Sequence, residues 1–218
     1  MIAPIFPLPD VVLFPKTYLP LHVFEARYRA MTREALAGDG TIVMALLRDG
    51  VELNDQGNPA VHEVACLGKI DSCEELDGGK FDIVLAGLHR VRLVREIRHA
   101  PYRLARVERI AEARYDDLSQ EVSQRRERLV DLYARYRKLA APRRSRVSDF
   151  VPRRNFEALV NRVAAALLLP PEDKQLLLEI DDIAERCDHV VQALEQHVDS
   201  LLLVNRYGHL KPRDPGRN

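Results

Sequence analysis

The spacing of apolar residues changes once along the chain, near residue 116. Before this point the apolar residues form short alternating or continuous runs. After it they recur every three or four residues over long stretches. A period of two is typical of strands, and a period of 3.6 is typical of helices. The sequence therefore predicts an α+β protein with a strand-rich first part and a helical second part.

Short strands are predicted in the first part of the chain. The runs lie at residues 41–47, 64–70, 81–85, 91–94 and 102–107. Turn signals rich in glycine and asparagine separate several of them. One helix is predicted over residues 25–36, because Tyr28, Met31 and Ala35 have helical spacing and Gly38 follows. Short strands with one helix favour a closed or partly closed barrel, since closure removes exposed strand edges.

Amphipathic helices are predicted in the second part. Apolar stripes run over residues 118–139, 156–167 and 183–201. Pro142 ends the first helix, and Pro170-Pro171 separate the second from a short helix over 172–179. Asp182 and Glu185 stand before the last stripe in the pattern of a capping box. The pattern indicates a helical bundle.

These patterns divide the chain into three parts. We expect a β-rich barrel over residues 1–112, a helical bundle over 117–206 and a disordered tail over 207–218. Basic and acidic residues both number 33, so net charge provides no general attraction to nucleic acid or to membranes. The start of the chain lacks the features of a secretory signal, and no apolar run reaches the roughly 18 residues of a spanning helix. With three cysteines in no framework spacing, we expect a cytoplasmic protein with free thiols.

The start of the chain carries a specific resemblance. The stretches FPLPDVVLFP at residues 6–15, LPLHVFE at 19–25 and RYR at 27–29 are similar to the start of the substrate-binding domain of the Lon ATP-dependent proteases. Later motifs follow in the family's order, and the resemblance extends over residues 2 to about 205. It implies a PUA-like β-barrel followed by a helical bundle, and a role in recognising polypeptide substrates or partner proteins. Lys16 stands where the family often has glycine, so we expect this loop to differ.

No catalytic residue, metal or cofactor is predicted. The ATPase and serine-lysine protease domains of Lon lie beyond the region of resemblance, and Gly79-Lys80 lacks the first glycine of a phosphate-binding loop. His62 and Cys66 have nearly the spacing of a zinc motif. In a strand, however, they would lie about 13 Å apart. We therefore expect a standalone, non-catalytic relative of the domain.

Charge is unevenly distributed in the helical part. A basic patch consists of Arg143, Arg144, Arg146, Arg153 and Arg154. Residues 172–199 hold nine acidic residues against only Lys174 and Arg186. Such segments attract each other or solvate opposite faces in many proteins, but the basic patch is also able to bind an acidic partner or an RNA backbone.

Two function hypotheses follow. The first is a module that binds unfolded or extended polypeptide or a partner protein, with an adaptor role in protein quality control. Its candidate contacts are Leu13, Phe14, Tyr18, Phe24, Arg27, Arg90 and Tyr102. The alternative is a PUA-like RNA-binding protein that uses the basic segment 135–154. The absence of tryptophan and the low aromatic content of 6% argue against this alternative, because few aromatic side chains are present on which RNA bases would stack.

Overall fold

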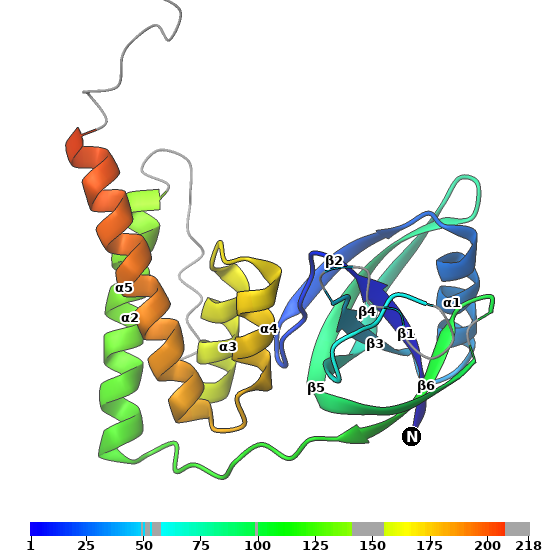
Figure 1. The fold of residues 1–218 in the computed structure, drawn as a ribbon, viewed down its shortest axis with the longest axis horizontal. Helices are drawn as coiled ribbons and strands as arrows, with labels where there is room; N and C mark the ends of the chain where they lie inside the picture. Colours follow the sequence, from blue (N-terminus) through cyan, green and yellow to red (C-terminus); the bar gives the residue numbers. More distant parts are fainter. Residues whose placement is uncertain (49, 51–52, 54–57, 99, 141–154, 208–218) are drawn as a thin grey trace, which may run out of the picture.

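The computed structural model describes residues 1–48, 50, 53, 58–98, 100–140 and 155–207. Within these residues the fold is α+β, as predicted. Figure 1 shows a strand-rich half that carries helix α1 and a half made of the helices α2 to α5. The strand-rich half comes first in the chain, and the two halves lie side by side.

The strands form a closed ring with one additional strand. They are β1 (Ile2–Leu8), β2 (Tyr18–Val23), β3 (Thr41–Leu46), β4 (Val64–Leu76), β5 (Lys80–Arg98) and β6 (Arg103–Arg109). Neighbours pair in the order β2-β5-β4-β3-β1-β6, and β6 also pairs with β5. This last pairing closes the barrel. β1 and β3 are parallel, whereas the other pairs are antiparallel.

One long strand, β5, replaces the two short strands expected at 81–85 and 91–94. Its first half pairs with β2 and its second half pairs with β6. Gly87 keeps the middle of the strand extended while another segment approaches it closely. The N–H of Lys16 donates to the carbonyl of Gly87 at 2.7 Å, and the N–H of Gly87 donates to the carbonyl of Thr17 at 2.8 Å. Gly87 lies between the two expected strands in the sequence, and in the structure it is a packing position within one strand.

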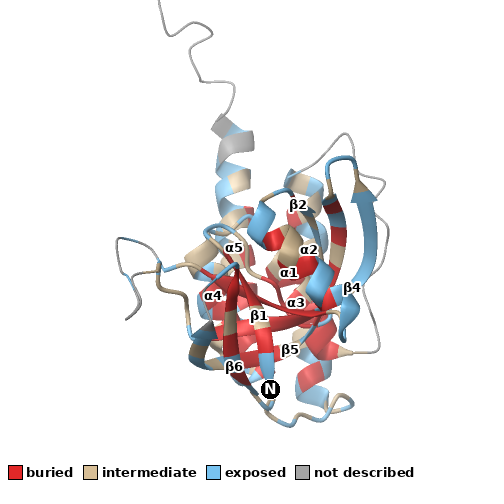
Figure 2. Cartoon of the chain, turned by 90° about the vertical axis from the view of Figure 1, so that its right-hand side faces the viewer, coloured by how far each residue is buried: buried red, intermediate tan, exposed pale blue. Residues whose placement is uncertain are grey.

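Helix α1 (Ala26–Ala37) packs on the barrel with Tyr28, Met31, Thr32 and Ala35 buried. The predicted helix over 25–36 differs from it by one residue at each end. On its outer side α1 holds the turn between β4 and β5, because Arg29 and Arg33 donate to the carbonyls of Gly78 and Gly79. Figure 2 shows that most of the outer part of β4 is exposed, while the strands of the ring are largely buried.

The helical half contains α2 (Gln120–Ala140), α3 (Phe156–Ala166), α4 (Pro171–Glu179) and α5 (Ile183–Tyr207). The long helices α2 and α5 run side by side in the same direction, and α3 and α4 lie between them and the barrel (Figure 1). Acidic residues of α5 pair with α2, through Arg125 with Asp188 and Arg128 with Glu195. Asp182 caps α5, because its carboxylate accepts from the N–H groups of Ala184 and Glu185.

The two halves share part of their core. Phe14 and Val64 from the strand-rich half pack in the apolar cluster of the helices. The predicted division between residues 112 and 117 falls in the connection between β6 and α2. Residues 208–218 of the predicted tail lie outside the described residues.

Candidate polypeptide-binding surface

Arg90, a predicted contact for polypeptide, is fully buried at the junction of the two halves. Its Nε donates to Glu112 at 2.6 Å, and its Nη1 donates to the carbonyls of Leu178 and Ile180, both at 3.1 Å. These carbonyls belong to the C-terminal end of α4, where backbone acceptors lack partners within the helix. The guanidinium also suits the negative end of the helix dipole. Arg90 therefore joins β5 to α4, and it is not available to a ligand.

Arg186 is the second fully buried arginine at this junction. It shares Glu112 with Arg90 and donates to the side chain of Asn161 at 2.8 Å. Asn161 in turn donates to the carbonyl of Pro15 at 3.2 Å. Burial lowers the pKa of the Arg186 guanidinium, and the nearby Glu112 opposes this change. This network ties the loop before β2 to α3 and α5.

The loop before β2 also explains Leu13 and Phe14, two further predicted contacts. Leu13 is buried in the barrel core, and Phe14 is fully buried against the helices. Neither of these two predicted contacts is exposed to a ligand in this structure. Lys16 does adopt a positive φ of 61°, although a side chain makes that conformation costly. Its ammonium group pairs with Glu157 and contacts the side chain of Asn155 at 3.3 Å, which offsets the cost.

Tyr18 and Phe24, in contrast, are both 60% exposed. Tyr18 begins β2 and Phe24 follows its last residue. The ring of Phe24 stacks with that of His22 at a centroid distance of 6.0 Å, and His22 contacts Asp82 at 2.6 Å. Among the described residues, β2 pairs with β5 alone. Its other edge therefore has backbone groups that an extended segment is able to pair with, except at Pro20, which lacks an N–H.

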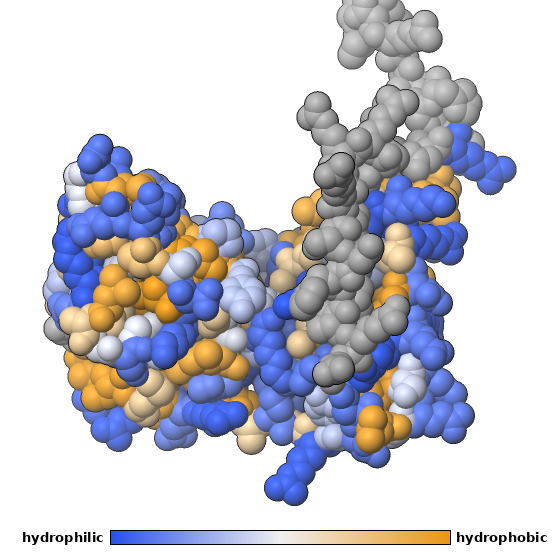
Figure 3. Space-filling view, turned by 180° about the vertical axis from the view of Figure 1, so that it is seen from behind, coloured by the Kyte–Doolittle hydropathy of each residue, from blue (hydrophilic) through white to orange (hydrophobic). Residues whose placement is uncertain are grey.

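A groove of about 500 Å³ lies over the face of the sheet where β2, β5 and β4 are neighbours. It is lined by residues of β2, β4 and β5, including Leu21, Cys73 and Ile83. Two acidic residues, Glu74 and Asp82, lie on it as well. The back view in Figure 3 shows apolar side chains gathered on the barrel half between charged ones. The surface is thus mixed, as expected for a site that contacts both side chains and backbone.

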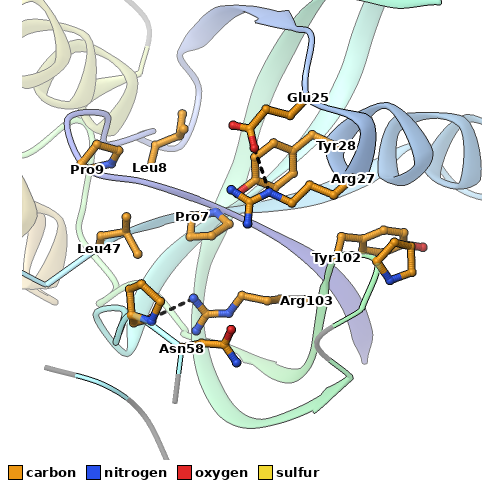
Figure 4. Close-up of a pocket in the computed structure, with 12 residues that line it drawn as sticks. Pro7, Leu8, Pro9, Glu25, Arg27, Tyr28, Leu47, Asn58, Tyr102 and Arg103 are labelled. Atoms are coloured by element: carbon orange, nitrogen blue, oxygen red, sulfur yellow. Dashed lines mark hydrogen bonds and ion pairs between the residues drawn. The ribbon is translucent and has the colours of Figure 1, made fainter. Parts of the chain in front are cut away.

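A smaller pocket of about 210 Å³ lies at the start of α1 (Figure 4). Its lining comes from the end of β1, the start of α1 and the segments around Leu47, Pro59 and Pro101. Two predicted contacts, Arg27 and Tyr102, belong to it. Along the chain, the loop at Pro15 is followed by β2, by Phe24 and then by Glu25, which lines the pocket. The edge strand β2 therefore leads toward the pocket.

The charged groups of this pocket are mostly paired. Arg27 donates to Glu25 at 2.9 Å and lies over the ring of Tyr28, 4.5 Å from its centroid. Arg103 is held by Glu96 and by the carbonyl of Pro59 at 3.0 Å. Burial raises the pKa of the Tyr28 hydroxyl, so this group stays neutral at physiological pH. Arg27 is exposed, which makes it the cation best placed to reach a ligand.

Tyr102 lines the pocket, but only a small part of its surface is exposed there. Its side chain is buried, and its hydroxyl donates to Glu34 of α1. Although Tyr102 lines the pocket, little of its side chain is therefore available for contact with a polypeptide. Sequence reasoning missed Pro7, Pro9 and Pro101 as lining residues, although the clustered prolines of the opening stretch were a visible signal.

The size and lining of the pocket indicate what it is able to hold. Its volume is below the roughly 300 to 1,000 Å³ of sites for small molecules and cofactors. Its described lining has no serine, threonine, cysteine or histidine that would act as nucleophile or base. Four prolines and two leucines make up half of the twelve lining residues, and the other half are charged residues, an asparagine and two tyrosines. Such a pocket suits one side chain of a polypeptide.

The near-zinc motif has a structural role. His62 pairs with Glu172 at 3.0 Å and with Glu179 at 3.4 Å, so it connects the barrel to α4. Cys66 is buried, and burial raises the pKa of its thiol. Within the described parts of the chain, no three histidine, cysteine or acidic side chains gather as metal ligands would.

The basic patch at Arg143, Arg144, Arg146, Arg153 and Arg154 lies outside the described residues. The prediction of an RNA-binding segment over 135–154 therefore has no structural account beyond the last turn of α2. Among the helices that are described, none is long and apolar enough to cross a membrane.

Comparison with known proteins decides the family. The model of the ATP-dependent protease La (LON) substrate-binding domain matches residues 2–196. The chain belongs to the Lon substrate-binding domain family. The resemblance seen in the opening stretch is thereby confirmed, and the match includes both the barrel and most of the helical half.

Relatives of this Lon substrate-binding domain are much longer than the chain. Lon protease 2 of Herpetosiphon aurantiacus is 28% identical over 204 residues, which cover 92% of this chain and 24% of the relative. Lon protease of Citrifermentans bemidjiense is 29% identical over 202 residues, which cover 92% and 25%. The chain thus spans about a quarter of the length of these proteases.

Solved structures show the same fold. A Lon N-terminal domain protein from Xanthomonas campestris aligns with a TM-score of 0.65 at 22% identity, covering 88% of this chain and 98% of that one. The N-terminal domain of a Mycobacterium avium complex Lon protease aligns with a TM-score of 0.63 at 20% identity, covering 90% and 100%. At these identities the likeness concerns the fold alone.

Proposed function

We propose that this Lon substrate-binding domain binds extended segments of unfolded polypeptide along the edge of β2. The observation that carries the proposal is the family match over residues 2–196, since the family is that of a substrate-binding domain. The binding surface consists of Tyr18, Phe24 and the pocket that contains Arg27. We propose further that the protein presents bound polypeptide to other proteins, as an adaptor in protein quality control.

Physical arguments support the edge of β2 as the place of contact. An extended segment gains backbone hydrogen bonds when it adds to a free strand edge, and side chains beside that edge supply selectivity. Tyr18 and Phe24 are large aromatic residues that remain exposed, and aromatic residues are enriched among binding hot spots. Pro20 interrupts the row of donors, which limits permanent pairing between copies and favours short, reversible contacts.

The pocket at the start of α1 supplies the second contact. Since β2 ends at Val23 and Glu25 lines the pocket, a segment added to β2 continues toward it. One apolar side chain of the segment fills the space between the prolines. The guanidinium of Arg27 then donates to a backbone carbonyl of the segment, which requires only that its contact with Glu25 loosens.

The double substitution Tyr18→Ser with Phe24→Ser tests this proposal. Fluorescence anisotropy of fluorescein-labelled casein measures its affinity for the protein. We expect the double variant to bind at least about tenfold more weakly, because loss of one hot-spot aromatic typically costs more than 1 kcal/mol. Both side chains are exposed, so the free energy of unfolding changes little.

Leu118→Ser is the matched control. Leu118 is 91% exposed and lies in the connection before α2, far along the chain from β2. This variant removes a similar apolar surface, and we expect unchanged affinity for casein. Equal affinity of the double variant and the wild type would contradict the proposed site. Competition by single-stranded RNA, with binding that falls steeply as salt rises, would instead favour the nucleic-acid hypothesis.

A further inference from the structure

A second groove, of about 460 Å³, lies on the helical half between α4 and α5. Its apolar lining consists of Leu169, Leu176, Leu177, Ile180 and Ala193. Leu176 is 62% exposed, although it sits in the middle of α4 between Gln175 and Leu177, which are both buried. The groove is separate from the barrel surface described above, because none of its described lining comes from the barrel.

The volume of this groove alone does not separate a helix from a small molecule, because 460 Å³ is within the roughly 300 to 1,000 Å³ of small-molecule sites. α4, which forms one wall of the groove, has nine residues and is about 14 Å long, or between two and three helical turns. A partner that covers Leu176 and the trough would remove apolar surface from water, which contributes about 25 cal/mol per Å². Two or three side chains of an amphipathic helix would fill such a trough.

The acidic residues of this region indicate the charge of the partner. Of the nine acids between 172 and 199, three pair with arginines of the protein, namely Asp181, Asp188 and Glu195, and two contact His62, namely Glu172 and Glu179. Asp182 caps α5. Within the described residues, Asp173, Glu185 and Asp199 have no lysine or arginine partner.

One of these acids lines the groove, and helical spacing places the other two beside it. Asp173 lines it directly. On α5 the lining residues include His189 and Gln196. Residues three or four apart lie on the same face of a helix. Glu185, four residues before His189, and Asp199, three residues after Gln196, therefore lie at the two ends of the row of lining residues. The helix dipole favours Asp173 and Glu185 in the first turns of α4 and α5, but it does not account for Asp199.

We propose that the groove between α4 and α5 docks an amphipathic, basic helix of a partner protein. Apolar side chains of that helix at positions i, i+3 or i+4 and i+7 enter the trough. Its lysines or arginines face Asp173, Glu185 and Asp199. The site is independent of the edge of β2, so one chain holds an unfolded polypeptide on the barrel and a folded partner on the helices.

The probe for this proposal is a synthetic amphipathic helix with leucines at i, i+3, i+4 and i+7 and lysines beside them. Fluorescence anisotropy at low and high salt compares it with two peptides, one with glutamate in place of every lysine and one with the same composition in scrambled order. The lysine peptide should bind at least about tenfold more tightly than either, and its advantage over the glutamate peptide should shrink at high salt.

Variants then locate the contact. Leu176→Lys should weaken binding of the lysine peptide at least about tenfold, because it puts a charge into the apolar trough. Asp173→Asn with Asp199→Asn should weaken it mainly at low salt. Leu118→Lys is the control, since it changes a leucine outside the groove that is even more exposed than Leu176. The Tyr18 and Phe24 variant should bind the lysine peptide like the wild type, which separates this proposal from the proposed function.

Three results would overturn the inference. The first is equally tight binding of the lysine and glutamate peptides. The second is unchanged binding of the lysine peptide by the Leu176→Lys variant. The third is a concentration-dependent dimer in sedimentation equilibrium that Leu176→Lys converts to a monomer. This would mean that a second copy of the chain, and not a basic helix, covers the groove.

Discussion

Arg90→Ala should lower the free energy of unfolding by about 3 to 5 kcal/mol, the typical cost of removing one partner from a buried ion pair. The variant removes the Arg90 donor from the carbonyl of Leu178, and it leaves the carbonyl of Ile180 and the carboxylate of Glu112 with Arg186 alone. Because Arg90 joins β5 to α4, the attachment of the helical half to the barrel should weaken, although Asn161, Lys16 and Phe14 still connect the two halves. Urea unfolding followed by circular dichroism measures this change.

Arg92→Ala is the matched control for this prediction. Arg92 lies two residues further along β5, is exposed, and contacts Glu63 at 3.4 Å. Exposed ion pairs contribute at most about 1 kcal/mol, so this variant should unfold almost like the wild type. If both variants unfolded at the same urea concentration as the wild type, the junction would not depend on Arg90.

Gly87→Ala should lower the free energy of unfolding by about 3 kcal/mol or more, at the upper end of the cost of overpacking. A Cβ at this position would lie 2.1 Å from the carbonyl oxygen of Phe14 and 3.3 Å from the Cα of Pro15. Both are backbone atoms, so no side-chain rotation relieves the clash. The loop must move, and Phe14 would then leave its fully buried place among the helices.

Thermal unfolding provides the measurement for Gly87→Ala. For a chain of this length, a change of 3 kcal/mol lowers Tm by roughly 6 to 12 °C. Gly38→Ala is the control, because the nearest atom to its added Cβ would be 3.5 Å away and its φ is −104°. A Tm of Gly87→Ala within about 2 °C of the wild type would contradict the close contact between β5 and the loop, since that shift corresponds to less than 1 kcal/mol.

The sequence was sufficient for the order and type of the elements, because these depend on local patterns. The helix over 25–36, the helical second part and the cap at Asp182 follow from spacing and capping residues, and the structure confirms them. The continuity of β5 does not follow from local patterns, because a glycine such as Gly87 occurs both in turns and in tightly packed strands. Only the loop at Phe14, seventy residues away along the chain, distinguishes the two cases.

The candidate site was harder to predict, because exposure depends on contacts that are distant in the sequence. Phe14 and Phe24 both stand in apolar segments of the opening stretch, yet one is fully buried among the helices and the other is exposed. Arg90 was expected to be at the surface because charged residues usually are. Its burial requires the end of α4 and Glu112, neither of which a local pattern reveals.

The most direct test of the central claim is hydrogen exchange, measured by mass spectrometry, with and without saturating unfolded casein. Amides of residues 18–28 should exchange more slowly when casein is bound, because added backbone hydrogen bonds protect the edge of β2 and the start of α1. Residues 41–46 of the buried strand β3 should not change. Protection confined to α2 and α5, with none at residues 18–28, would contradict binding along the edge of β2.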